Sequence, residues 1–333
     1  MKEPRVAIVG ATGMVGQEMR QVLQQREFPL ADLTLLASQR SRGRALEFRG
    51  ETLPVQVLDR DSFDGIELAL LSAGTGISKE FSPLAVKAGA VVVDNSNAFR
   101  MEPEVPLVVP EVNPAEALKH KGIISNPNCS TIQMVVVLQP LHQAFSIRRV
   151  VVSTYQSVSG TGKEAVEELA QQVRATEAGE PPVAEVYPHQ IAYNCLPHID
   201  VFLENGYCRE EQKVIDETRK IMGEPDLPIT ATAVRVPVLI GHSESVNIQF
   251  AKPVEPESAR AVLAEAPGVE VLDDPGNNLY PLAIDCEGKD PSYVGRIRKD
   301  FSAPNALNLW IVSDNLRKGA ALNAVQIAEL LLG

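Results

Sequence analysis

The sequence predicts two domains: an α/β domain with a doubly wound parallel sheet, then an α+β domain whose sheet is mostly antiparallel. In about the first 125 residues, short apolar runs alternate with helical patterns, as parallel strands joined by crossover helices do. From about Arg148 the candidate strands become longer and two charged helices interrupt them, which is typical of an antiparallel sheet with helices on one face. A length of 333 residues also fits two domains, at about 150 residues per domain.

The first domain is expected to begin with a strand at 5–9, a glycine turn and a helix over 15–25. Further apolar runs predict parallel strands at 33–37, 68–72 and 90–94, and a stretch at 82–88 is compatible with a helix. This order of strand, turn and helix predicts a Rossmann-type domain that binds a dinucleotide.

The second domain is expected to contain longer strands at 150–155, 229–236, 245–250 and 307–313. Charged helices are expected at 163–178 and 210–222, and Gly and Pro residues predict loops at 178–182 and 273–278. Pro140 is expected to kink or end the helix that follows Cys129. An amphipathic helix over 316–332 is expected to pack back on the first domain.

The amino-acid composition excludes several classes of function for this protein. Hydrophobic residues make up 44% and charged residues 22%, which is typical of a soluble globular protein. Lys and Arg minus Asp and Glu give 31 − 43 = −12, so the chain lacks the basic surface that nucleic acid or an anionic membrane would need. The N-terminus has neither a signal-peptide nor an anchor pattern, and we expect a cytoplasmic protein. No metal is expected, because no Cys-x-x-Cys pair occurs among Cys129, Cys195, Cys208 and Cys286.

A glycine-rich motif, Gly10-Ala-Thr-Gly13-Met-Val-Gly16, follows the first strand and opens the first helix. Backbone N–H groups in this setting can bind a pyrophosphate at the positive end of the helix. The alternative is that the glycines only tighten a turn. The strand-turn-helix context favours nucleotide binding.

The segment after the second strand reads Ser38-Gln-Arg40-Ser41-Arg42, where an acidic residue for the ribose 2′-OH would be expected. Its basic and hydroxyl side chains favour a 2′-phosphate, and hence NADP over NAD. The competing interpretation is a solvated basic loop.

Cys129 comes directly after a strand-like stretch and begins a helical one, where free N–H groups stabilise a thiolate. It is therefore a candidate nucleophile, although most cysteines are inert core residues. A second cluster runs from Arg235 to His242. Histidine has the right pKa to move protons near neutrality, and the arginine fork suits a carboxylate. His242 is catalytic only if it meets Cys129 in space.

With these residues identified, the chain closely resembles the aspartate-β-semialdehyde dehydrogenases over essentially its full length. The resemblance rests on seven ordered motifs, namely Gly10 to Gly16, Val93 to Arg100, Asn126 to Thr131, Ser153 to Gly160, Arg235 to Val246, Val294 to Lys299 and Val312 to Gly319. It implies a homodimer, with an NADP-binding domain at 1–128 completed by the helix 314–333, and a catalytic and dimerisation domain at 129–313. It also implies the reversible conversion of aspartate semialdehyde, phosphate and NADP⁺ into aspartyl-β-phosphate and NADPH, a step toward lysine, threonine and methionine.

The resemblance implies residue roles as well. Cys129 matches the nucleophile that forms a thioester, His242 the acid/base residue, and Gln156 the residue that orients the acyl intermediate. For the substrate, Arg235 matches the ligand of the α-carboxylate and Glu210 that of the amino group. Lys213 and Arg100 match phosphate ligands, and Asn128 belongs to the substrate site. Without the resemblance, Glu210 and Lys213 would be interpreted as an exposed i,i+3 ion pair.

For the cofactor, the resemblance implies three groups of residues: the loop at the pyrophosphate (Gly10, Thr12, Gly13, Met14, Val15, Gly16), the 2′-phosphate site (Ser38, Arg40, Ser41), and the nicotinamide end (Ser159, Gly160, with Asn315 close by). Two alternatives remain open. One is another acyl-phosphate reductase, such as one acting on N-acetylglutamyl phosphate, whose acetylated amine would give Glu210 no cation. The other is a non-catalytic NADP-binding sensor, which would need neither Cys129 nor His242.

Overall fold

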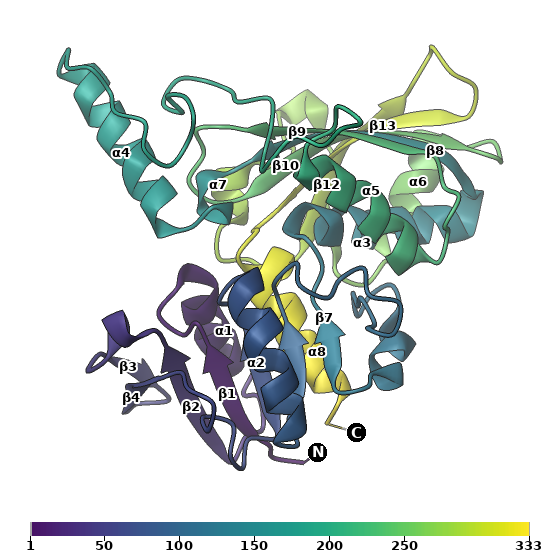
Figure 1. The fold of residues 1–333 in the computed structure, drawn as a ribbon. Coiled ribbons are helices and arrows are strands. Elements are labelled where there is room, and N and C mark those ends of the chain that lie inside the picture. Colours follow the sequence, from purple (N-terminus) through teal and green to yellow (C-terminus); the bar gives the residue numbers. More distant parts are fainter. Residues whose placement is uncertain (1, 333) are drawn as a thin grey trace. The chain divides into compact units, whose positions relative to one another are not determined.

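A computed structural model describes residues 2–332, and the chain divides into two compact units. The first unit comprises Met1–Asn128 and Ala320–Gly333, and the second unit is Cys129–Gly319 (Figure 1). The sequence analysis assigned the C-terminal segment to the first domain from residue 314, whereas residues 314–319 belong to the second unit in the structure. None of the helices within the described range is long and apolar enough to cross a membrane.

The first unit contains a seven-stranded sheet in the order β3-β4-β2-β1-β5-β6-β7. Its parallel strands are β1 (Arg5–Val9), β2 (Asp32–Ala37), β4 (Glu51–Val57), β5 (Leu68–Leu71), β6 (Val91–Asp94) and β7 (Ile123–Ser125). The edge strand β3 (Ala45–Phe48) runs antiparallel to β4. The chain winds outward from β1 in both directions, so the predicted doubly wound sheet is confirmed.

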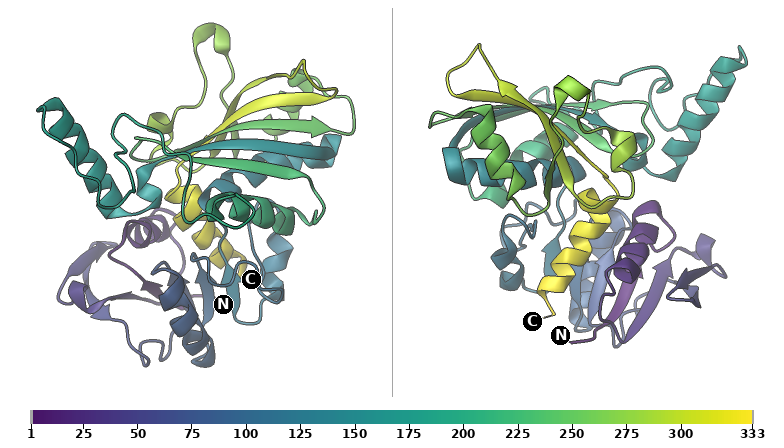
Figure 2. Two further views of the ribbon diagram at one scale, coloured as in Figure 1. Left: turned by 45° about the horizontal axis from the view of Figure 1, so that its top comes forward. Right: turned by 180° about the vertical axis from the view of Figure 1, so that it is seen from behind.

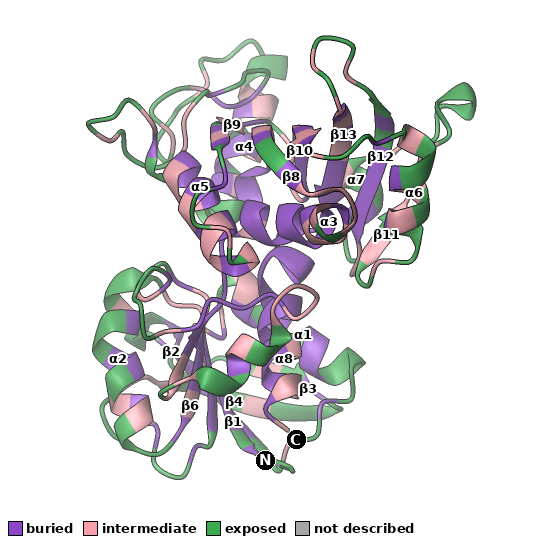
Figure 3. Cartoon of the chain, turned by 90° about the vertical axis from the view of Figure 1, so that its right-hand side faces the viewer, coloured by how far each residue is buried: buried purple, intermediate pink, exposed green. Residues whose placement is uncertain are grey.

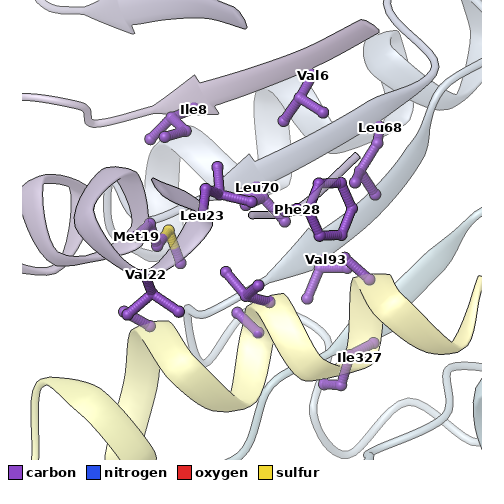
Figure 4. Close-up of a cluster of buried hydrophobic side chains, with 14 of the residues drawn as sticks. Val6, Ile8, Met19, Val22, Leu23, Phe28, Leu68, Leu70, Val93 and Ile327 are labelled. Atoms are coloured by element: carbon purple, nitrogen blue, oxygen red, sulfur yellow. The ribbon is translucent and has the colours of Figure 1, made fainter. Parts of the chain in front are cut away.

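Helices cover both faces of this sheet, which explains why its strands are apolar on both sides. Val6 and Ile8 of β1 face α1 (Met14–Gln25) and α8 (Leu322–Leu330), which lie side by side (Figures 2 and 4). Ala7 and Val9 face the opposite layer, where α2 (Thr75–Lys87) packs.

Two expectations about the helices of the first unit need correction. The helix expected at 82–88 begins at Thr75 and contains Pro83. The C-terminal helix is not amphipathic over 316–332: a π-helical turn occupies Arg317–Ala321, and α8 follows it. Six of the nine residues of α8 are buried, because it packs against α1 and also against the strand side chains.

The second unit contains a six-stranded sheet in the order β11-β12-β13-β10-β8-β9. Its strands are β8 (Ile147–Gln156), β9 (Ile229–Arg235), β10 (His242–Phe250), β11 (Val269–Val271), β12 (Ser292–Lys299) and β13 (Ala306–Ser313). The three central pairings are antiparallel, as expected, while β8 with β9 and β11 with β12 are parallel. The sequence analysis missed β11 and β12.

Three helices cover one face of this sheet: α3 (Cys129–Phe145), α5 (Arg209–Met222) and α6 (Pro256–Ala264). Of the two charged helices expected on this face, only the one predicted at 210–222 lies there, and α6 was not predicted. Helices α4 (Lys163–Glu177) and α7 (Ala283–Cys286) lie outside that layer. Helix α3 is buried along most of its length (Figure 3). It passes Pro140 and ends five residues later, so the proline does not end the helix. Its apolar packing offsets the backbone hydrogen bond that proline removes.

Candidate active site

Polar residues from the ends of several strands lie together along one side of the second sheet. Gln156 and Arg235 are the last residues of the parallel strands β8 and β9, and they pair in register. His242 is the first residue of β10, which runs antiparallel to β8. The carboxyl ends of β8 and β9 and the amino end of β10 therefore meet on this side.

Cys129 is the first residue of α3, where the positive end of the helix dipole favours an anionic sulfur. One turn later, the Gln133 amide donates a hydrogen bond of 3.2 Å to the backbone carbonyl of His242. This bond ties the start of α3 to the start of β10. A Cβ atom added to Gly319 would lie 3.0 Å from the Cys129 Cβ, so a side chain at residue 319 would require Cys129 to shift by a few tenths of an ångström.

His242 is fully buried. Burial, reinforced by the nearby Arg235 cation, lowers the pKa of His242 to about 3. This differs from the ordinary histidine pKa on which the sequence analysis relied, because desolvation disfavours the charged ring. The backbone N–H of Ser157 donates to Nδ1 at 3.0 Å, so the proton of the neutral ring lies on Nε2. Nε2 has no hydrogen-bond partner within residues 2–332.

Arg235 is 5% exposed, and its Nη1 donates to the backbone carbonyl of Ser157 at 2.6 Å. Its Nε has no partner in the described part of the chain. A Cβ atom on Gly160 would lie 3.2 Å from Nη1 of Arg235 and 3.3 Å from Nε2 of His242. The guanidinium and the imidazole therefore face the same small space, which the missing side chain of Gly160 leaves open.

Gln156 is joined to a charged cluster on α5. Its amide donates to Glu210 at 3.1 Å, and Glu210 accepts from the Lys213 ammonium at 3.1 Å. Asp200 pairs with the same ammonium at 3.2 Å, which the sequence analysis did not foresee. Glu210 is 5% exposed, so the pair is not the exposed i,i+3 ion pair of the alternative interpretation.

A capping box sets the position at which α5 begins. The Cys208 N–H donates to the Glu211 carboxylate at 2.7 Å, and the N–H of Ala233 in β9 donates to its other oxygen at 2.9 Å. Glu211 thus anchors the first turn of α5 to the sheet. The anchored turn presents Glu210 toward Gln156.

Asn315 joins three segments around His242. Its side-chain oxygen accepts from the Gly241 N–H at 2.8 Å and from the Ser157 hydroxyl at 3.0 Å, and its Nδ2 donates to Ser159 at 3.0 Å. Ser159 and Gly160 lie in a short 3₁₀ turn at Val158–Gly160. The structure brings these expected cofactor residues next to the histidine within the second unit.

The glycine motif of the first unit has the geometry of a phosphate-binding loop. Gly10 directly follows β1 and has a φ of +85°, and a Cβ atom on Gly16 would lie 2.2 Å from the Gly10 carbonyl oxygen. The backbone therefore turns closely onto the N-terminus of α1, whose first residues are Met14 and Val15. Thr12 links this loop to the turn after β2 by a 3.0 Å contact between its hydroxyl and that of Ser41.

The turn after β2, at Gln39–Ser41, carries the other residues expected at a 2′-phosphate. Ser38 and Arg40 are exposed, and Arg40 forms no ion pair among residues 2–332. Within the described residues, no group of three His, Cys, Asp or Glu side chains could hold a metal ion.

Arg100 and Asn128 belong to the first unit. Arg100 is 7% exposed and donates from Nε to the carbonyl of Asn126 at 2.9 Å and from Nη2 to that of Asn95 at 3.0 Å. It therefore braces the loops that follow β6 and β7. Asn128 is buried directly before Cys129.

Comparison with known proteins decides the family. Two family models match, "Semialdehyde dehydrogenase, NAD binding domain" at residues 5–120 and "Semialdehyde dehydrogenase, dimerisation domain" at residues 138–318. The chain is 56% identical over 332 residues to the aspartate-semialdehyde dehydrogenase of Aquifex aeolicus (strain VF5), covering 98% of each chain. The chain belongs to the aspartate-semialdehyde dehydrogenase family. It is an enzyme, and the predicted family is confirmed.

Solved structures of this aspartate-semialdehyde dehydrogenase family share the fold. Aspartate semialdehyde dehydrogenase II from Vibrio cholerae, complexed with ASA, matches with a TM-score of 0.97 and 46% identity over 100% of this chain and 99% of that one. An aspartate semialdehyde dehydrogenase with NADP from Candida albicans matches with a TM-score of 0.77 and 26% identity over 99% and 98% of the two chains. The first unit is thus an NAD(P)-binding domain.

One buried acid in this member of the aspartate-semialdehyde dehydrogenase family was not found from the sequence. Glu244 lies two residues after His242 on β10 and is fully buried. Neither of its carboxylate oxygens accepts a hydrogen bond of good geometry within residues 2–332. Burial raises the pKa of Glu244 well above its usual value near 4.5, although the nearby Gln133 side chain opposes this shift. In the sequence, the one signal that could have pointed to Glu244 was the alternation of Ser and Glu after His242.

Proposed function

We propose that the enzyme catalyses the reversible, NADP-dependent and phosphate-dependent oxidation of L-aspartate 4-semialdehyde to L-aspartyl-4-phosphate, in the synthesis of lysine, threonine and methionine. The observation that carries this proposal is the hydrogen bond from Gln133 to His242, which joins the helix start bearing Cys129 to the strand start bearing His242. Gln156 and Arg235, which lie at the carboxyl ends of β8 and β9, supply side chains suited to an amino-acid substrate.

Arg235 and Glu210 are proposed to orient the substrate. The Nε of Arg235 has no partner in the described chain, so one edge of the fork is available to the α-carboxylate. Glu210 is buried beside Gln156 and offers a carboxylate to the amino group. Lys213 would supply positive charge to phosphate, and the family resemblance implies the same role for Arg100.

In the oxidising direction, the Cys129 thiolate attacks the aldehyde carbon and forms a tetrahedral adduct whose oxygen carries the negative charge. His242, neutral with its proton on Nε2, donates a hydrogen bond to that oxygen. The bound nicotinamide accepts the hydride, which leaves a thioester on Cys129. Gln156 orients the acyl group while phosphate attacks it, and the acyl phosphate leaves as the thiolate is restored. The low pKa of His242 favours hydrogen-bond donation over the proton-taking role that the resemblance implies.

The choice of NADP over NAD rests on the turn after β2. Ser38, Arg40 and Ser41 stand where an NAD-specific domain has an acidic residue, and the contact between Thr12 and Ser41 brings this turn beside the phosphate-binding loop. The guanidinium of Arg40 suits a phosphate, and a carboxylate at this position would repel one.

Replacing Arg40 with alanine should raise the KM for NADP by tenfold or more, because a charge-assisted contact contributes about 1.5–3 kcal/mol. The KM for NAD should change little. Steady-state kinetics with each cofactor measure both values, and Arg42→Ala, at an exposed neighbouring arginine, is the matched control. An unchanged KM for NADP would refute the 2′-phosphate assignment.

A homodimer through the second unit is also proposed. Helices α3, α5 and α6 cover one face of the sheet, while the other face presents the Tyr155–Trp310 pair, with ring centroids 5.4 Å apart. A cavity of about 320 Å³ lies beside Trp310. The match to the dimerisation-domain model supports this assembly.

Withdrawing phosphate tests the proposed reaction. Without it, the thioester has no acceptor, so NADPH formation should stop after about one equivalent per active site and steady turnover should fall by roughly 100-fold or more. A stopped-flow absorbance trace with and without phosphate measures both phases, and sulfate at equal ionic strength is the control. Sustained turnover without phosphate would overturn the proposal.

A further inference from the structure

The segment between α4 and α5 crosses residues 178–208 without a regular helix or strand. Its backbone meets the end of β9 through a bridge between Leu196 and Arg235. Irregular segments of this length within compact domains are usually functional. The segment follows α4 in the chain and is drawn in the same teal (Figure 1).

Two buried side chains of α4 hold this segment. The Glu168 carboxylate accepts hydrogen bonds from three successive backbone N–H groups, those of Glu185, Val186 and Tyr187 at 2.6, 2.6 and 3.3 Å. One turn later on α4, Gln172 accepts from the N–H groups of Ile191 and Ala192 and donates to the carbonyl of Val183. Glu168 is 6% exposed and Gln172 is 1% exposed, so water competes little for these bonds.

The hydrogen bonds of Glu168 and Gln172 to this segment place the Tyr187 ring over Arg235. The Cζ atom of Arg235 lies 5.9 Å from the ring centroid, which is within cation–π range. The Tyr187 hydroxyl donates to Thr161 at 2.9 Å, and the ring packs against the cluster formed by Val158 and its neighbours. Tyr187 is therefore fixed at its backbone, its ring and its hydroxyl.

Apart from Tyr187, few groups of the chain hold the Arg235 guanidinium. Within residues 2–332, the Arg235 guanidinium forms one hydrogen bond, the 2.6 Å bond from Nη1 to the Ser157 carbonyl, and no carboxylate forms an ion pair with it. One hydrogen bond alone does not fix the orientation of the guanidinium plane. Tyr187 and Arg235 also line the same cavity of about 240 Å³, together with His198 and Asp200.

We propose that Tyr187 is a positioning residue that holds the Arg235 guanidinium in the orientation that binds the substrate carboxylate, and that Glu168 and Gln172 hold Tyr187 in place. This inference rests on the proposed role of Arg235. It assigns the irregular segment a part in substrate selection.

The test compares Tyr187→Leu with Tyr187→Phe. The leucine variant should raise the KM for aspartate semialdehyde about tenfold, the loss expected for a desolvated cation–π contact, with kcat changed less than about twofold. The phenylalanine variant keeps the ring and should restore KM to within about twofold of the wild type. Tyr193→Leu is the matched control, since Tyr193 lies in the same segment and is 64% exposed.

A double-mutant cycle with Arg235→Lys separates positioning from folding. If Tyr187 acts through the guanidinium, Tyr187→Leu should raise KM by less than about twofold in the Arg235→Lys background. Additive effects, or a fall in kcat with unchanged KM, would overturn the inference. If the leucine variant does not fold, Glu168→Gln takes its place: it keeps the side-chain size but replaces one of the two accepting oxygens with a donor. It should raise KM about threefold, and an unchanged KM counts against the proposal. Failure of the proposed function is visible separately, because the wild type would then show no phosphate-dependent turnover.

Discussion

Replacing Cys129 with alanine should lower kcat for phosphate-dependent NADPH formation by about 10⁴-fold or more, because no covalent acyl intermediate can form. The fold should survive. Alanine is a strong helix former and keeps the Cβ atom that packs against Gly319. The loss should therefore appear in activity and not in the melting temperature.

Two measurements check this result. Steady-state absorbance of NADPH gives kcat, and differential scanning calorimetry gives the melting temperature. Cys195→Ala removes an exposed thiol from the same unit and should leave both values unchanged. A Cys129→Ala enzyme with more than a few percent of wild-type kcat would remove Cys129 from the chemistry.

Replacing Glu244 with glutamine should make the enzyme more stable than the wild type, increasingly so as pH rises. The raised pKa means that folded Glu244 keeps its proton at pH values where the unfolded chain has lost it. The folded state therefore loses relative stability as pH increases above about 4.5, by about 1.4 kcal/mol per pH unit while Glu244 stays protonated. Glutamine is neutral in both states, so the free energy of unfolding of the variant should increasingly exceed that of the wild type as pH rises above about 4.5.

The free energies of unfolding of the wild type and of Glu244→Gln are best compared between pH 6.5 and 8. His242 has the opposite dependence: its pKa of about 3 means that the folded state loses stability as pH falls below about 6.5. Urea denaturation at several pH values gives the free energy of unfolding of each variant. Glu204→Gln, at an exposed glutamate, is the matched control. Parallel curves for the wild type and Glu244→Gln would show that Glu244 is ionised in the fold.

Local sequence patterns predicted those parts of this enzyme that depend on residues close together in the sequence. The Gly10 loop, the parallel strands beside it and the start of α3 at Cys129 all follow from short-range spacing, and the structure has these elements. Helical spacing also places Glu210 beside Lys213, but it suggested an exposed ion pair and did not show that Glu210 is buried.

Long-range contacts were not predictable from the same patterns. Asp200 reaches Lys213 only because the irregular segment folds back toward α5. The pKa of His242 depends on complete burial, which its own sequence neighbourhood does not reveal. Helix α8 looked amphipathic because the sequence could not show that both α1 and the sheet cover it. Strand β12 contains three basic residues, which obscured its buried face.

The chain passes between its two units twice, between Asn128 and Cys129 and between Gly319 and Ala320. Within the second unit, the backbone of Gly319 lies against the Cys129 Cβ atom, so both crossing points of the chain lie at Cys129. A side chain larger than hydrogen at residue 319 would therefore press on the first turn of α3 and shift Cys129 with it.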